Sequence, residues 1–229
     1  MTELEYQALM LSLKVGAYAV LWLIPLGVFL AWLLSRKEFF GKSILDSLIH
    51  LPLVLPPVVI GYLLLVSLGR QGFLGRWLYE HLGLVFSFNW KGAVVACIVV
   101  ALPLMVRSVR LSLESVDPKL EHAASTLGAS PLKVFLTITL PLTIPGIITG
   151  TMLSFARSLG EFGATISFVS NIPGETQTIP LAMYNFIETP GAEMEAARLC
   201  IISIALALST LMISEGLNRK AASRLGAKR

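Results

Sequence analysis

Two oppositely charged side chains stand four residues apart inside an apolar segment of this sequence. Arg157 and Glu161 lie in a stretch that also offers the hydroxyl groups of Ser154, Ser158 and Thr165. An ionisable residue at membrane depth is costly and by default indicates a route for ions or substrates. A guanidinium with nearby hydroxyl donors suits an anion, so these residues are candidates for a translocation path. The alternative is that Arg157 and Glu161, at positions i and i+4, only neutralise one another while helices pack.

The other polar side chains form no catalytic or metal-binding pattern. His50, His81 and His122 are scattered, and none stands at metal-ligand spacing. Cys97 and Cys200 fall in apolar segments, which predicts small core residues rather than a disulfide or a metal site. The sequence contains no G-x-x-x-x-G-K-[ST] phosphate loop. We therefore expect no catalytic residue, no metal and no cofactor in this chain, and any ATP must be hydrolysed by another chain.

Residues 117–140 form a polar insert between long apolar segments. Asp117 followed by Pro118 is typical of a helix start. Gly128 then ends the first helix as a left-handed cap, and Ser130 with Pro131 starts a second helix. The first helix carries one narrow stripe that is small at its centre, made of Leu120, Ala123, Ala124 and Leu127. We interpret the segment as two short helices that form a knob for docking in a groove.

Composition places the chain in a membrane. Of its 229 residues, 55% are hydrophobic and 14% are charged, with a mean hydropathy of +0.76, whereas soluble domains carry roughly 25% charged residues. We expect one all-α, polytopic transmembrane domain over residues 1–229, with no separate nucleotide-binding domain. Its five predicted membrane helices are residues 8–34, 48–68, 92–113, 141–168 and 199–217.

Prolines mark irregular parts of this pattern. Pro56 and Pro57 interrupt the 48–68 span, and broken backbone at membrane depth is tolerated only where it packs in protein or lines a watery cavity. Both prolines therefore join the candidate translocation path. In residues 69–91 the apolar side chains fall near one face, which predicts a short amphipathic helix at the interface. Pro173 and Gly174 indicate a turn in a polar, acidic loop before the last span.

Lysine and arginine residues are unevenly distributed between the two sides of the predicted membrane domain. Twelve of the eighteen fall in the first loop, around the 117–140 insert and in the tail, which carries Arg219, Lys220, Arg224, Lys228 and Arg229. The positive-inside rule makes that side the cytoplasm, with the N-terminus outside and the C-terminus inside. The start of the chain has no basic n-region, so we expect no removable signal peptide. We interpret the tail as a membrane anchor and not as a nucleic-acid site.

The polar insert also resembles a family signature. Glu121, Ala123, Ala124, Gly128, Ile138, Leu140 and Pro141 match E-x-A-A-x(3)-G-x(9)-I-x-L-P, the EAA loop of ABC importer permeases. The resemblance implies that residues 117–140 are cytoplasmic and insert into a cleft of an ATPase subunit. The coupling residues it implies are Glu121, Ala123, Ala124, Leu127, Gly128, Ser130 and Pro131. The alternative is an ordinary helical hairpin between two spans.

Nearly the whole chain resembles the bacterial molybdate permeases within that family, most clearly over residues 51–57, 156–166 and 168–176. The resemblance implies a multi-pass protein of the bacterial cytoplasmic (inner) membrane that moves molybdate inward. It further implies a homodimer, two cytoplasmic subunits that bind ATP and Mg²⁺, and a periplasmic molybdate-binding protein. Sulfate and tungstate permeases share the EAA loop, so both ions stay open as alternatives.

Two other classes of function were considered. An autonomous secondary transporter or channel would show inverted repeats and paired acids near the membrane midplane. An intramembrane enzyme would need a constellation such as Ser/His, His/Glu or paired Asp in its spans. The sequence shows neither feature.

Overall fold

The computed structural model describes residues 1–224, and over these residues the chain is helical without β-strands. Its α-helices are α1 (Glu3–Arg36), α2 (Lys42–His50), α3 (Pro57–Leu68), α4 (Phe73–Leu82), α5 (Trp90–Glu114), α6 (Pro118–Thr126), α7 (Pro131–Val134), α8 (Leu140–Leu159), α9 (Gly163–Val169), α10 (Ile179–Glu188) and α11 (Glu193–Arg224). A 3-10 turn, η1 (Leu51–Leu53), follows α2, and a π-helical turn, η2 (Phe135–Thr139), joins α7 to α8. Lys228 and Arg229 of the basic tail lie outside the described residues.

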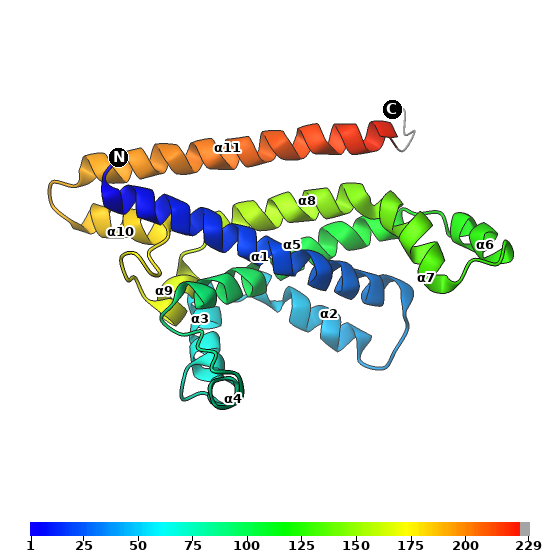
Figure 1. Ribbon diagram of the computed structural model, residues 1–229, viewed down its shortest axis with the longest axis horizontal. Coiled ribbons are helices and arrows are strands. Elements are labelled where there is room, and N and C mark those ends of the chain that lie inside the picture. Colours follow the sequence, from blue (N-terminus) through cyan, green and yellow to red (C-terminus); the bar gives the residue numbers. More distant parts are fainter. Residues whose placement is uncertain (225–229) are drawn as a thin grey trace.

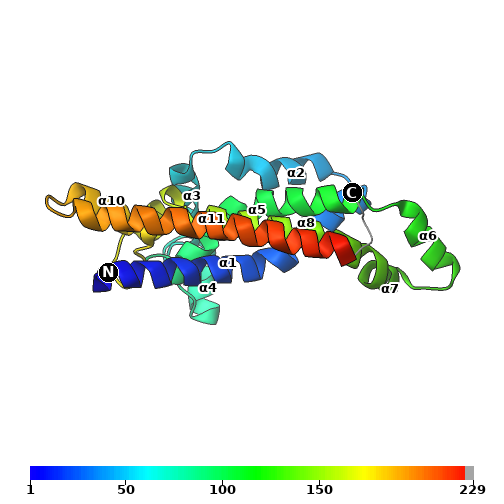
Figure 2. The same cartoon turned by 90° about the horizontal axis from the view of Figure 1, so that it is seen from above.

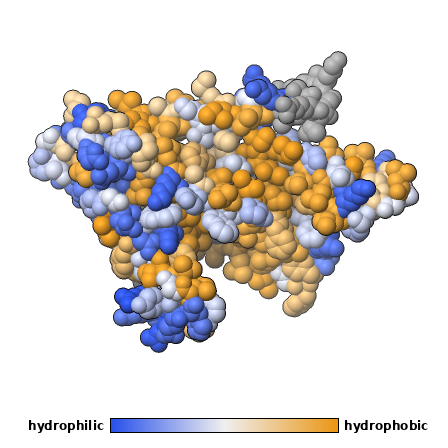
Figure 3. Space-filling model, in the orientation of Figure 1, coloured by the Kyte–Doolittle hydropathy of each residue, from blue (hydrophilic) through white to orange (hydrophobic). Residues whose placement is uncertain are grey.

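The long helices α1, α5, α8 and α11 run along one common axis (Figures 1 and 2). We call the end that holds the N-terminus and α10 the outer end, and the end that holds α6 and α7 the inner end. Apolar residues dominate the middle of the face shown in Figure 3. Among the described residues, four helices are long and apolar enough to cross a membrane, or five if the bent α2–α3 pair is one span. The prediction of an all-α polytopic membrane protein is confirmed.

The central helix α5 packs closely between α1 and α8 because glycines line both contacts. A Cβ atom at Gly27 of α1 would lie 2.4 Å from Met105 Cγ of α5. On α8, a Cβ at Gly146 would lie 2.3 Å from Ser112 Cβ, and one at Gly150 would lie 2.7 Å from Met105 Sδ. Only residues without side chains let the helix backbones approach this closely.

The predicted span 48–68 is broken where the prolines indicated. α2 ends at His50 and α3 begins at Pro57, and the two parts are bent by 116°. Pro57 takes an initial position of α3, where the missing N–H leaves no orphan donor. α3 therefore leaves the long axis and carries α4, the helix predicted within residues 69–91, to the side of the molecule (Figure 1).

The predicted span 141–168 is not one helix, which corrects the sequence interpretation. α8 ends at Leu159 and α9 begins at Gly163. Gly160 and Gly163 are poor helix formers. Glu161 between them offers its carboxylate to a free N–H group of α9, so the interruption leaves fewer unpaired backbone donors.

The segment before the last span is more structured than the predicted polar loop. It contains α10, whose Ile179, Leu181 and Ala182 are buried. The backbone N–H of Ile179 donates to Ser12 Oγ of α1 at 2.7 Å, which fixes α10 against the outer end of α1. α11 then begins at Glu193, ahead of the predicted start at 199.

Replacing Gly146 with valine should force α5 and α8 apart. The added atoms would overlap Ser112 and the carbonyl oxygen of Ser108, and such overpacking costs about 1–3 kcal/mol. We expect a lower thermal-aggregation midpoint of the purified protein in detergent. Gly216→Val is the matched control, since no atom lies within 4 Å of a Cβ placed there. Equal midpoints for the two variants would contradict the close α5–α8 contact.

Candidate functional site

The break between α8 and α9 is organised by one buried carboxylate. Glu161 Oε2 lies 2.7 Å from Arg157 Nη1, and Glu161 Oε1 accepts a hydrogen bond from the backbone N–H of Ala164 at 2.7 Å. The Glu161 side chain is 1% exposed, whereas that of Arg157 is 33% exposed. Glu161 therefore both neutralises Arg157 and caps the start of α9.

The hydroxyl groups predicted for the translocation path are already engaged with backbone. Ser154 Oγ donates to the carbonyl oxygen of Ala101 at 3.4 Å, and Ser158 Oγ donates to that of Ser154 at 2.8 Å. Thr165 Oγ1 donates to the carbonyl oxygen of Phe162 at 2.8 Å. All three hydroxyl-bearing residues are buried. The structure thus brings the predicted residues together around the α8–α9 break, but their hydroxyl groups donate to backbone carbonyl oxygens and do not line an open path.

The two broken spans cross each other at the outer half of the molecule. A Cβ at Gly61 of α3 would lie 2.5 Å from the carbonyl oxygen of Ala164 in α9. A Cβ at Gly163 would lie 2.8 Å from Pro57 Cβ, which places the predicted proline pair beside the α8–α9 break. Pro56 precedes this contact and is exposed. α3 and α9 together form a tightly packed layer against α5.

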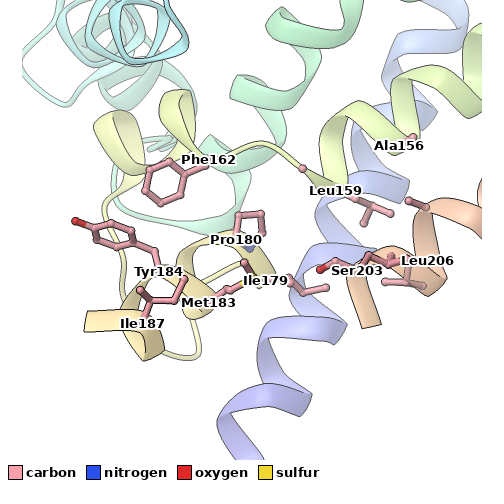
Figure 4. Close-up of a pocket in the computed structure, with 13 residues that line it drawn as sticks. Ala156, Leu159, Phe162, Ile179, Pro180, Met183, Tyr184, Ile187, Ser203 and Leu206 are labelled. Carbon is pink, nitrogen blue, oxygen red and sulfur yellow. The ribbon is translucent and has the colours of Figure 1, made fainter. Parts of the chain in front are cut away.

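A cavity of about 520 Å³ lies on the other side of the same break, between α8, α10 and α11 (Figure 4). Phe162 and Tyr184 of its lining pack against each other, with ring centroids 5.3 Å apart. Most of the other lining residues are apolar, among them Leu159, Ile179, Pro180, Met183 and Ile187. Such a lining does not suit an oxyanion.

The polar insert projects from the inner end as the two predicted short helices (Figure 1). No residue of α6 is buried, and Leu120 and Leu127 are 48% and 89% exposed. Ala123 is also exposed on this face, while Ala124 is partly covered. α6 thus presents a free apolar stripe at its surface.

Local caps set the shape of this insert. Asp117 Oδ1 accepts from the N–H of Lys119 at 2.9 Å at the start of α6. Gly128 has φ +85°, the left-handed conformation expected for a helix end that turns the chain. Ser130 Oγ accepts from the N–H of Lys133 at 3.4 Å, and Pro131 opens α7.

Glu121 binds within its own chain. Its Oε1 lies 2.9 Å from Arg36 Nη2 at the end of α1 and accepts a hydrogen bond from Thr139 Oγ1 at 2.7 Å. Arg36 Nη2 also donates to the carbonyl oxygen of Leu113 at 3.3 Å. These contacts tie α6 to α1, α5 and η2. Glu121 thus has its basic partner in the same chain, on α1.

The Arg36–Glu121 contact joins positions far apart in the chain, and the sequence patterns did not predict it. The patterns also missed the outer end of α1, where Glu5 is buried and its Oε1 lies 2.9 Å from Arg198 Nε of α11. Arg198 Nη2 contacts Glu195 Oε1 at 2.8 Å as well. No spacing rule connects the two ends of a chain, so only the fold reveals these pairs.

The described residues contain no group of three or more His, Cys, Asp or Glu side chains that could hold a metal ion. Cys97 is buried and its Sγ lies 3.7 Å from the carbonyl oxygen of Ser158, while Cys200 is a free, partly exposed thiol. The candidate site therefore consists of the packed contact between α3 and α9, the Arg157–Glu161 ion pair and the exposed apolar stripe of α6.

Comparison with known proteins gives a consistent result over most of the chain. Residues 23–219 match the family described as "Binding-protein-dependent transport system inner membrane component". The chain is 65% identical over 226 residues to "Molybdenum transport system permease protein ModB" of Escherichia coli (strain K12), covering 99% of each chain. It is 62% identical over 223 residues to the protein of that name from Haemophilus influenzae, covering 97% of each chain.

More distant proteins share the fold. A bacterial ABC transporter involved in the import of alginate has a chain with TM-score 0.77 and 17% identity, covering 96% of this chain and 80% of that one. The MetNI methionine ABC transporter has a chain with TM-score 0.68 and 14% identity, covering 96% and 99%. "Sulfate transport system permease protein CysT" of Escherichia coli is 37% identical over 187 residues, covering 82% of this chain and 66% of that protein.

Variants of Glu161 should separate its two roles at the helix break. Glu161→Gln keeps an oxygen for the Ala164 N–H but loses the ion pair, whereas Glu161→Ala loses both. Loss of a cap costs about 1 kcal/mol, and Arg157 is then left without its partner. We expect Glu161→Ala to give the lower thermal midpoint and the lower yield of monodisperse protein. The pairing would be contradicted if Arg157→Gln and Glu161→Gln lowered the midpoint additively in the double variant.

The Arg36–Glu121 pair should protect α6 from proteolysis. In Glu121→Gln the freed helix should open more often, so tryptic cleavage at Lys119 and Lys133 should speed up several-fold. Arg36→Gln should have the same effect, and the double variant should be no faster than either single one. Glu38→Gln is the control, because Glu38 is 88% exposed in its pair with Lys42. Unchanged cleavage in Glu121→Gln would show that the pair does not hold α6.

Proposed function

The chain belongs to the family of binding-protein-dependent transport system inner membrane components, and on that premise we propose that it is the membrane-spanning subunit of an importer that carries molybdate into the cell. Identity of 65% over nearly the full length to a molybdenum transport permease carries the choice of substrate. The sulfate permease is a more distant relative, at 37% identity. ATP hydrolysis belongs to a separate subunit.

The inner end of the molecule has the properties that coupling to an ATPase requires. α6 exposes a stripe of Leu120, Ala123 and Leu127 whose central residue is small, so another surface can approach it closely. The Arg36–Glu121 contact and the turn at Gly128 hold the stripe in one direction relative to α1. A displacement of α6 is therefore passed to the long helices instead of being absorbed by a flexible loop.

The proposed importer function implies three kinds of partner. A second copy of the chain completes the translocation path, two cytoplasmic ATP-binding subunits receive the α6 helices, and a periplasmic molybdate-binding protein delivers the anion. The inner end faces the cytoplasm, because the basic residues gather there. The binding protein would dock at the outer end, beside α10 and the loop before it.

The residues around the α8–α9 break shape the outer closure of the path and do not bind the anion. Arg157 is neutralised by Glu161, and the hydroxyl groups of Ser154, Ser158 and Thr165 donate to backbone carbonyl oxygens. Movement of α3 against α9 would open this closure. Gly61 and Gly163 place no side chain of their own between those helices.

The test is uptake into proteoliposomes that contain this chain and its ATPase. Uptake of labelled molybdate should require internal ATP and an added molybdate-binding protein. Equimolar tungstate should suppress uptake much more strongly than sulfate. Equal suppression by sulfate would move the chain to the sulfate permeases, and uptake without ATP would indicate an autonomous transporter or channel.

The same preparation can test whether α6 couples the chain to its ATPase. Ala123→Leu enlarges the exposed stripe of α6, and overpacking at the contact by about 1–3 kcal/mol would weaken ATPase association roughly 5- to 150-fold. Co-purification of the ATPase measures this effect. A conservative change at the tip of the tail helix, Arg219→Gln, is the control. Wild-type association of Ala123→Leu would show that α6 is only a connector.

A further inference from the structure

One face of α5 changes its surroundings halfway along the helix. Ala93, Ala96 and Val100 of this face are buried in the cluster that α5 forms with α3 and α9. The same face continues towards the inner end at helical spacing with Leu104, Arg107, Leu111 and Glu114. There it is open: Arg107 and Glu114 are exposed and Leu111 is 61% exposed.

The path of the neighbouring helices explains this change. α3 turns away from the long axis by 116° relative to α2, so it covers only the outer half of α5 (Figure 1). At the inner half, α8 packs on another face of α5 through Gly146 and Gly150. α2 lies on a third face, where Asp46 Oδ2 is 3.2 Å from Arg110 Nη1. The Arg107 face lies between these two contacts, on the inner side of the α3–α9 closure.

Arg107 differs from five other arginines of the long helices because no carboxylate of the described residues contacts its guanidinium. Within the described residues it has no ion pair or hydrogen bond from its side chain to a carboxylate. Five other arginines of these helices have carboxylate partners: Arg36 with Glu121, Arg110 with Asp46 and Glu114, Arg157 with Glu161, Arg198 with Glu5 and Glu195, and Arg219 with Glu215. An unpaired charge within a membrane helix is costly unless it faces water or meets an anion.

Arg107 lies ahead of the inner end of α5. It stands seven residues before Glu114, the last residue of α5, which corresponds to about 10 Å along the helix axis. Arg110, one turn further in the inward direction, already has two carboxylate partners. Arg107 therefore leaves α5 about two helical turns before the helix ends.

We propose that Arg107 lines the inner half of the translocation path and makes transient contact with the oxyanion after it has passed the α3–α9 closure. The guanidinium stays protonated and places a fixed positive charge beside the passing oxyanion. Because the side chain is exposed, water screens this charge, so the contact is weak and the anion is released to the cytoplasm. This inference rests on the proposed importer function, since it assigns a residue to the route of the same substrate.

The first test compares uptake by variants of the assembled complex at saturating binding protein and ATP. Arg107→Gln should lower the maximal rate of molybdate uptake at least fivefold, while Arg107→Lys should retain most of it. ATP hydrolysis without binding protein and the yield of complex should stay at wild-type values. Arg219→Gln, which removes one exposed cation elsewhere, should transport normally. If wild-type chain transports molybdate and Arg107→Gln transports equally well, the inference is wrong while the proposed function stands.

A second test asks whether position 107 faces water. Arg107→Cys in the complex should react with membrane-impermeant methanethiosulfonate reagents added from the inner side, above the background of the parent chain with Cys97 and Cys200. A trimethylammonium-ethyl adduct should restore uptake, whereas a sulfonato-ethyl adduct should not, because only the former returns a positive charge. Failure to react would place the residue against lipid or under the second copy, and equal uptake with both adducts would show that its charge is irrelevant. Either outcome overturns the assignment, as would loss of complex yield in Arg107→Gln.

Discussion

Backbone hydrogen bonding inside a membrane is the constraint on which this structure depends. Two of its spans are interrupted, and each interruption frees N–H and C=O groups where no water is guaranteed. At the α2–α3 break the chain begins the new helix with Pro57, which has no N–H to satisfy. At the α8–α9 break it uses the Glu161 carboxylate, and Arg157 balances the buried charge. The interruptions are thus stabilised by residues of the same chain.

The broken helices give the molecule its functional asymmetry. Because α3 and α9 meet through Gly61 and Gly163, they close the outer half of α5 without bulky side chains between them. The same bend that brings α3 there removes it from the inner half. One end of α5 is therefore sealed and the other is open, and α1 runs beside it from the Glu5–Arg198 pair to the Arg36–Glu121 pair. In the proposed importer, α1 is anchored at both ends and would carry motion from α6 to the contact between α3 and α9.

Sequence reasoning predicted those features that depend on local chemistry. Hydrophobic runs predicted the long helices, Asp117 and Gly128 predicted the ends of α6, and the prolines predicted the break before α3. It failed at the α8–α9 break, because Gly160 and Gly163 lie in a run apolar enough to read as one span. It also could not choose between the two roles of Arg157. That choice depends on where Glu161 points, and the buried cap on Ala164 favours packing.

A subunit that receives its substrate from a separate binding protein gains little from a strong site of its own. Tight binding inside the membrane would lower the free energy of the bound anion, which raises the barrier to its release and slows transport. The structure is consistent with this reasoning, since the hydroxyl groups of Ser154 and Ser158 and the Arg157–Glu161 pair are engaged within their own chain. Selectivity would then reside in the delivering protein, while the membrane subunit contributes a closure and a weakly attractive exit. On the proposal above, Arg107 supplies that attraction without holding the anion.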